Sequence, residues 1–230
     1  MAFEKSDSPQ FYVLQKEVVG SRYEVVVDEV EPISLGKGAN CPSCGKPVGM
    51  LPWLPPYRVQ LEMYGEALGD FIETTGYEFF VSERLKNAFH AEGLTGLQGF
   101  HPVEVLRVRR MRKGPKLTGT PQYFAVTTCN SRAALDIERS RIRYAEAPTC
   151  DECRYGHKDA IHGFSLETGS WQGQDVFRPR GLNGSLVVSE RFGRFVERHG
   201  FTNMRLTLTE EHVWNPRGSE PLPTTRQGSA

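Results

Sequence analysis

Four of the five cysteines fall in two Cys-x-x-Cys pairs, Cys41 with Cys44 and Cys150 with Cys153. Two cysteines at this spacing can place both sulfurs on one tetrahedral ion at about 2.3 Å, the Zn–S distance. Gly45 follows the first pair and relieves the tight turn there, whereas the second pair is followed by an arginine. The spacing therefore predicts one structural Zn²⁺ per chain, held by all four of these cysteines.

The separation of the two pairs leaves alternatives open. The 105 residues between them exceed the about 15–20 of a simple four-cysteine ribbon, so a shared ion requires the chain to return to its starting point. The alternatives are two separate sites completed by histidines such as His157 and His162, a lost metal site, and a redox dithiol. No similar histidines follow the first pair closely, and Pro52, Pro55 and Pro56 do. These features disfavour the two-site and redox interpretations.

The remaining chemistry of the chain does not indicate catalysis. A four-thiolate site leaves no coordination position for water or substrate, so it would stabilise the fold. Cys129 ends the run Tyr-Phe-Ala-Val-Thr-Thr-Cys and is interpreted as a small buried hydrophobic residue in a strand. The chain has no His-Glu-x-x-His, Gly-x-Ser-x-Gly, phosphate-loop or dinucleotide fingerprint. We therefore expect a protein that is not an enzyme.

A basic strip lies between the two cysteine pairs. It comprises Arg107, Arg109, Arg110, Arg112, Lys113 and Lys116. Such a strip could contact an acidic partner protein or phosphates, or it could be a solvated strand end before the Gly114-Pro115 turn. The chain carries 28 basic and 28 acidic side chains, and this balance argues against a protein that mainly coats nucleic acid or anionic membrane. The strip is the candidate partner-binding surface.

Short strands and two helices are expected to position these groups. Runs of β-branched and aromatic residues predict strands at 11–14, 23–27, 57–63, 103–109, 123–128 and 204–208. Ser82 and Ser189 can each cap a helix that has a glutamate in its first turn. The helices are predicted to end before Gly93 and Gly200, since glycine commonly follows a helix C-terminus.

The two helical segments resemble each other. Aligned without a gap at an offset of 107, Val81–Leu97 and Val188–Met204 are identical at six of 17 positions, whereas about one match would arise by chance. The cysteine pairs are 109 residues apart. We infer an α+β fold of two pseudo-repeats around a zinc-ribbon-like site, each with a Cys-x-x-Cys knuckle, short strands and one helix. In each repeat a strand is expected directly before the helix and a further strand after its Gly-capped turn.

The domain organisation is expected to be one compact unit. Its first half spans residues 11–128 and its second half 129–214, preceded by a flexible lead (1–10) and followed by a Pro/Gly-containing disordered tail (215–230). No window approaches the roughly 18 consecutive apolar residues of a membrane helix. The first ten residues also lack the apolar core of a secretory signal, so a cytoplasmic location is expected.

The knuckles, the Ser-Glu-Arg-Phe helix at 189–192 and the Gly-Phe-Thr at 200–202 together resemble the double-CxxCG motif family expanded in myxobacteria. The likeness spans about residues 11–208, although Arg154 stands where the family pattern has glycine. It implies a cytoplasmic, non-enzymatic immunity protein that binds and blocks a cognate polymorphic toxin, with metal ligands at the four paired cysteines. The alternative is a zinc-ribbon nucleic-acid-binding or regulatory protein that uses the basic strip.

Overall fold

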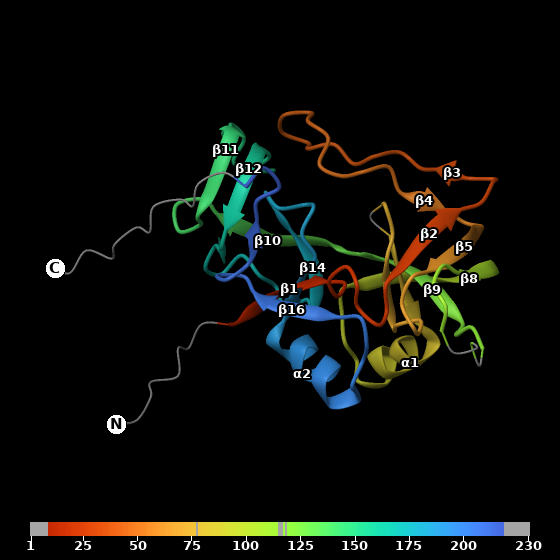
Figure 1. Ribbon diagram of the computed structural model, residues 1–230. Coiled ribbons are helices and arrows are strands. Elements are labelled where there is room, and N and C mark those ends of the chain that lie inside the picture. Colours follow the sequence, from red (N-terminus) through yellow and green to blue (C-terminus); the bar gives the residue numbers. More distant parts are fainter. Residues whose placement is uncertain (1–8, 77, 115–116, 118, 219–230) are drawn as a thin grey trace, which may run out of the picture.

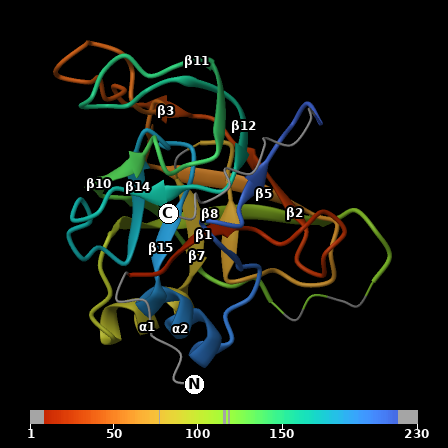
Figure 2. The ribbon, with the colours of Figure 1, turned by 90° about the vertical axis from the view of Figure 1, so that its left-hand side faces the viewer.

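The computed structural model describes residues 9–76, 78–114, 117 and 119–218. Strands make up 40% of it and helices 9%. Most strands belong to two curled six-stranded sheets, and two helices lie side by side at one end of the molecule (Figures 1 and 2). The predicted α+β class is therefore wrong, because the fold is mostly β.

The first sheet is built from the chain between the two cysteine pairs and one strand before them. Strands β5 and β8 run parallel, and the other neighbours are antiparallel. Alternate residues of β5 are buried from its first residue to its last, which is the period expected of a strand with one face in the core. The spatial order is β2 (Val25–Glu29), β5 (Tyr57–Met63), β8 (Leu97–Arg110), β9 (Tyr123–Thr128), β7 (Phe79–Ser82) and β6 (Phe71–Glu73).

The second sheet combines later segments with the first strand of the chain. Strand β1 lies between β15 and β16 and pairs antiparallel with both. Strands β10 and β14 run parallel. The spatial order is β13 (Ser165–Leu166), β10 (Asn130–Asp136), β14 (Val176–Arg180), β15 (Val187–Ser189), β1 (Phe11–Gln15) and β16 (Arg205–Leu208).

Two small sheets carry the cysteine loops. The hairpin of β3 (Ser34–Leu35) and β4 (Trp53–Leu54) encloses the first pair in its connecting loop. The second pair lies in the loop between β11 (Ile142–Glu146) and β12 (His157–His162), and β12 also pairs with β17 (Val213–Trp214). Each pair therefore lies in a loop between two antiparallel strands.

Both helices begin and end where the sequence predicts. Helix α1 (Glu83–Ala91) is capped by Ser82, whose Oγ accepts the Leu85 N–H at 3.2 Å. Helix α2 (Glu190–His199) is capped by Ser189 and ends at Gly200, which has a left-handed φ of 58°. Among the described residues, neither helix has the length and apolar character needed to cross a bilayer.

The six predicted strands are confirmed to within six residues at their ends, but many further strands were missed. Strand β12 has the sequence His-Lys-Asp-Ala-Ile-His, which contains a single β-branched residue. Strands β7 and β15, expected from the repeat but without bounds, have four and three residues, all of them buried, and each leads directly into a helix cap. Such segments show no period-two pattern and become strands through their pairing partners. The fold class was wrong because the two well-marked helices were conspicuous and these strands were not.

The two helices share one core cluster, to which both sheets contribute. The rings of Phe89 in α1 and Phe192 in α2 have centroids 6.5 Å apart. Val81 from the first sheet and Val188 from the second belong to the same cluster and are fully buried. Since one cluster draws on both halves, neither half encloses this core alone.

A carboxylate from the first half also binds the second half. Asp70 is buried and accepts hydrogen bonds from the Ser82 hydroxyl at 2.6 Å and from the Arg84 guanidinium. It further accepts the backbone N–H and the hydroxyl of Thr202, both at 2.9 Å. Thr202 lies in the turn after α2, so Asp70 links the cap of α1 to the end of the other helix.

The reciprocal contact is made by Asp175. Its carboxylate accepts from the Ser189 hydroxyl at 2.8 Å, from Arg191 Nη1 at 3.0 Å and from the Thr95 N–H at 2.9 Å. Thr95 lies in the turn after α1. The serines, arginines and threonines of the two contacts are each 107 residues apart, the offset of the sequence alignment. We call the two contacts together the reciprocal clasp.

Candidate metal centre

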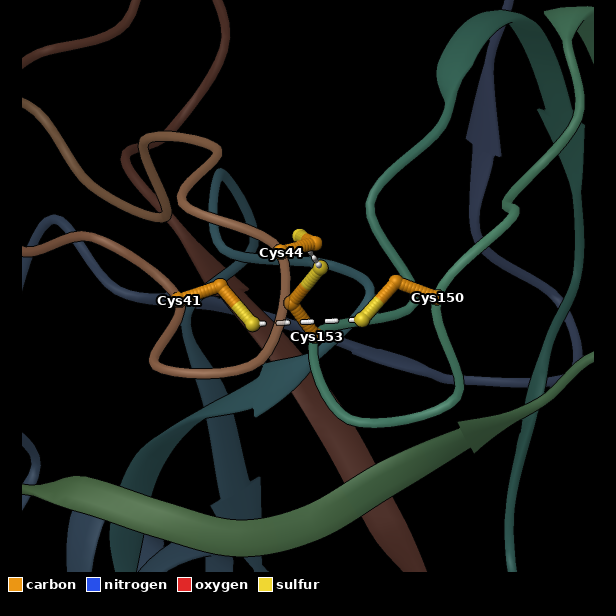
Figure 3. A group of neighbouring side chains, drawn as sticks. All are labelled: Cys41, Cys44, Cys150 and Cys153. Carbon is orange, nitrogen blue, oxygen red and sulfur yellow. Dashed lines mark hydrogen bonds between the residues drawn. The ribbon is translucent and has the colours of Figure 1, made fainter.

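The loops that contain the two cysteine pairs face each other (Figure 3). In the first loop the Cys41 N–H donates to the Lys46 carbonyl at 2.8 Å, and the Gly45 N–H donates to the Cys41 carbonyl at 2.9 Å. In the second loop the Arg154 N–H donates to the Cys150 carbonyl at 2.8 Å. The shared i to i+4 bond folds each Cys-x-x-Cys segment into a knuckle that turns both of its sulfurs to one side.

All four sulfurs meet at one point, although 109 residues separate the pairs. Cys41 Sγ lies 3.9 Å from Cys150 Sγ, and Cys44 Sγ lies 3.7 Å from Cys153 Sγ. All four lie within 4.8 Å of one another. A tetrahedral ion with sulfur ligands at about 2.3 Å requires sulfurs about 3.8 Å apart. The four cysteines therefore fit one metal ion, as the sequence predicts, and none of them forms a disulfide.

The surroundings favour ionisation of one thiol and oppose that of another. At Cys41, burial raises the pKa, but the backbone N–H groups of Cys44 and Ser43 stabilise the thiolate and bring its pKa down to about 7. At Cys153, burial and contacts with the other thiols raise the pKa to about 12, although the Tyr155 N–H lowers it in part. Four thiolates in one place repel one another, so a cation at their centre is what would hold all four ionised.

Arg154 adopts the glycine conformation of the knuckle. Gly45 has φ 72° and Arg154 has φ 51°, so both knuckles close with a left-handed residue. For a residue with a side chain this costs about 1–2 kcal/mol. The Arg154 guanidinium donates to the Leu135 carbonyl at 2.5 Å and to Glu167 Oε2 at 2.8 Å. These bonds hold the second turn in the geometry that glycine would adopt freely.

The other sulfur and nitrogen ligands lie outside this cluster. Among the described residues the four cysteines form the only group of potential ligands close enough for one ion, and neither His157 nor His162 belongs to it. Cys129 is half-buried in the connection between β9 and β10, one residue beyond the strand where it was expected. Burial raises the pKa of the Cys129 thiol, which is typical of an unreactive cysteine.

Some side chains of the basic strip bond to other residues of the protein, and others are exposed to solvent. Arg107, Arg109 and Arg110 lie at the end of β8. Arg109 forms an ion pair with Glu62 on the neighbouring strand β5. Arg110 donates to the carbonyls of Gly65 and Glu66 at 3.5 and 3.3 Å.

Beyond β8, Arg112 lies with its guanidinium 6.0 Å from the centre of the Tyr64 ring, and Lys113 is exposed. Lys116 lies outside the described residues. Sequence reasoning missed the carboxylate of Glu62, because register between β5 and β8 is a tertiary property. The signal that was available is the alternation of polar and apolar residues along β5, which places Arg58, Gln60 and Glu62 on one face of the strand.

A cleft of about 700 Å³ lies between the two sheets next to the metal centre. Its walls include residues 47–50 and residues 155–158, which directly follow the first and second knuckles. The ion would therefore fix both of these walls relative to each other. Sequence reasoning missed this cleft and the buried Glu78 on its wall, since no motif marks either.

The fold and the site define a β-rich protein with a cluster of four cysteines that could bind one metal ion. The chain belongs to the immunity protein family Imm11, whose family model matches residues 52–211. Membership implies a non-enzymatic role. The match includes the second knuckle and begins after the first, so the assignment of Cys41 and Cys44 rests on the geometry above. No curated protein matches the chain.

Proposed function

We propose that this protein is a cytoplasmic immunity protein that binds a cognate polymorphic toxin and blocks it without chemistry of its own. Membership of the Imm11 family is the observation that carries this proposal. The closed sulfur cluster supports it, because four thiolates leave an ion no open position for a substrate. The protein would act by occupying a surface of the toxin.

The proposal includes one structural Zn²⁺ per chain, bound by Cys41, Cys44, Cys150 and Cys153. Zinc is the metal that best suits four thiolates in a tetrahedral arrangement. The matching conformations of Gly45 and Arg154 support membership of the double-CxxCG group as well. The ion would connect segments that are far apart in the sequence and so stabilise the scaffold that presents the binding surface.

We further propose that the two halves are pseudo-repeats. Support comes from the reciprocal clasp, in which equivalent residues make equivalent contacts across the two halves. The exposed part of the basic strip, Arg107 with Arg112 and Lys113, is the proposed contact for acidic groups of the toxin. Its cations are accessible in the structure, whereas Arg109 is already paired with Glu62.

Growth of a heterologous host that expresses the neighbouring gene's product tests this function. Co-expression of the wild-type protein should restore growth, and the two proteins should co-purify as a complex. A variant with Arg107, Arg112 and Lys113 changed to serine should fold normally and protect less well, with Lys86→Ser on α1 as a control that leaves the strip intact. A toxic neighbour that the wild-type protein neither binds nor neutralises would contradict the proposal.

A further inference from the structure

A second cavity, of about 620 Å³, lies under the arm formed by β3, β4 and their connecting loop (residues 34–54). Its other walls are the end of β2 and residues 75, 76 and 78, which lead from β6 into β7. The arm carries the first knuckle, so the metal centre would hold it in place. We call this cavity the arm pocket.

The arm pocket is acidic. Its ionisable lining consists of two carboxylates, Glu29 and Glu78, and neither lysine nor arginine lines it among the described residues. The Glu29 carboxylate accepts the Thr75 hydroxyl at 3.1 Å. The electric field of the two carboxylates, inside walls of low dielectric constant, favours a cation.

Glu78 has an unsatisfied acceptor at this pocket. The residue is 5% exposed, and its Oε1 accepts the Trp53 N–H at 3.1 Å. Its Oε2 is buried and accepts no hydrogen bond from the described residues. Burial raises the pKa of Glu78; the charge of Arg178, which lines the 700 Å³ cleft together with Glu78, lowers it in part. A buried acceptor without a donor is unfavourable, and a ligand that supplies the donor removes that cost.

The rim of the arm pocket is apolar and unusually exposed. Leu35, Met50 and Leu51 line it and are 55%, 52% and 53% exposed. Trp53 forms a buried wall. Exposed apolar side chains that gather around a concave site are typical of protein-binding surfaces. A side chain with an apolar stem and a cationic end matches both the rim and the interior.

We propose that the arm pocket receives a basic side chain, arginine or lysine, from the toxin, and that Glu78 with Glu29 forms its counter-charge. This inference rests on the proposed function for the identity of the partner. The pocket itself can be tested without the toxin, because its chemistry predicts affinity for a small alkyl guanidinium.

The first experiment titrates butylguanidinium chloride into the full-length zinc-loaded protein and follows the backbone amides by NMR. Saturable shifts should localise to the arm, to Thr75 and to Gly76. Glu78→Gln should weaken binding at least about tenfold, while Glu83→Gln, an exposed carboxylate on α1, should leave it unchanged. The uncharged pentanol should bind at least about tenfold more weakly than butylguanidinium. Equal affinity of wild type and Glu78→Gln would overturn the proposal.

The second experiment measures the affinity of the same variants for the toxin. Glu78→Gln and Leu51→Ser should each weaken binding to the toxin at least about tenfold. Leu51 is exposed on the rim, so its replacement leaves no cavity in the core. If the wild type neutralises the toxin and both variants bind it equally well, the inference fails and the immunity function stands. If butylguanidinium binds through Glu78 but the wild type does not recognise the toxin, the pocket stands and the function fails.

Discussion

Replacing Asp70 by asparagine should destabilise the whole protein, because its carboxylate joins the two halves. Two hydrogen bonds end on Oδ1, from Ser82 Oγ and Arg84 Nε, and three end on Oδ2, from Arg84 Nη2 and from the N–H and hydroxyl of Thr202. Asparagine keeps one oxygen. With that oxygen at the Oδ2 position, its NH₂ group faces the Arg84 Nε–H as a donor against a donor, and the Ser82 hydroxyl loses its carboxylate acceptor.

The expected loss follows from these contacts. A hydrogen bond to a charged group contributes about 1.5–3 kcal/mol, and the Arg84 side chain is 52% exposed, so water compensates for much of its share. The buried Ser82 hydroxyl has no such compensation. We expect the free energy of unfolding to fall by about 2–3 kcal/mol, which lowers the melting temperature by about 4–12 °C in a chain of this size.

The pH dependence gives a second test of the same contact. Burial raises the pKa of Asp70, but the bonds from Arg84, Ser82 and Thr202 outweigh it and leave the pKa below its usual value. A carboxyl whose folded pKa is depressed stabilises the protein above its unfolded pKa of about 3.9 and loses that effect as the pH falls toward the folded pKa. The difference between wild type and Asp70→Asn should therefore be largest above about pH 4 and shrink below it.

Chemical denaturation of both proteins at pH 7 and at lower pH measures these differences. Glu104→Gln is the matched control, because the Glu104 carboxylate forms a surface ion pair with Arg58 at 2.9 Å and should contribute less than about 1 kcal/mol. Asp175→Asn should reproduce the effect of Asp70→Asn, since it makes the reciprocal contact. The reasoning is refuted if Asp70→Asn lowers the free energy of unfolding no more than the control does. It is also refuted if the two halves of Asp70→Asn unfold in separate transitions.

Two further predictions concern the metal centre. Cys153→Ser should lose its zinc, measured by elemental analysis, and its melting temperature should fall markedly, as should that of the wild type in a strong chelator. The control Cys129→Ser should keep about one zinc per chain. Equal melting temperatures with and without chelator would exclude a structural ion. Arg154→Gly should retain zinc, since glycine adopts φ 51° without strain. Its free energy of unfolding should change by less than about 2 kcal/mol, because the loss of the bonds to Leu135 and Glu167 opposes the relief of about 1–2 kcal/mol of strain. Zinc loss in Arg154→Gly would show that the arginine contacts, and not the turn, hold the second knuckle.

Local features of the fold were predictable from the sequence because neighbouring residues determine them. The caps at Ser82 and Ser189 bond N–H groups three residues on, and the left-handed Gly200 closes the helix that precedes it. Strand β5 shows its buried face in its own alternation. At the caps the stabilising contact lies within a few residues of the signal, whereas β5 shows its period locally but is stabilised by its distant partners β2 and β8.

The four cysteines that could bind a metal ion were also predictable, since Cys-x-x-Cys spacing is a local requirement of thiolate coordination. The sequence left open whether the two pairs share one site. That was decided by two hairpin loops, 109 residues apart, which place Cys41 next to Cys150. The left-handed φ at Arg154 likewise depends on distant partners, Leu135 and Glu167.

The fold class and the binding surfaces were decided by tertiary structure alone. Short strands such as β7 and β15 have no pattern of their own and exist because neighbouring strands satisfy their backbone groups. The pairing of Arg109 with Glu62 depends on the register between β5 and β8. The buried, unsatisfied oxygen of Glu78 belongs to a residue that lines a pocket together with the distant arm. The sequence by itself determined the helix caps and the spacing of the paired cysteines, whereas burial, register and charge pairing arise from contacts between segments that the sequence does not mark as neighbours.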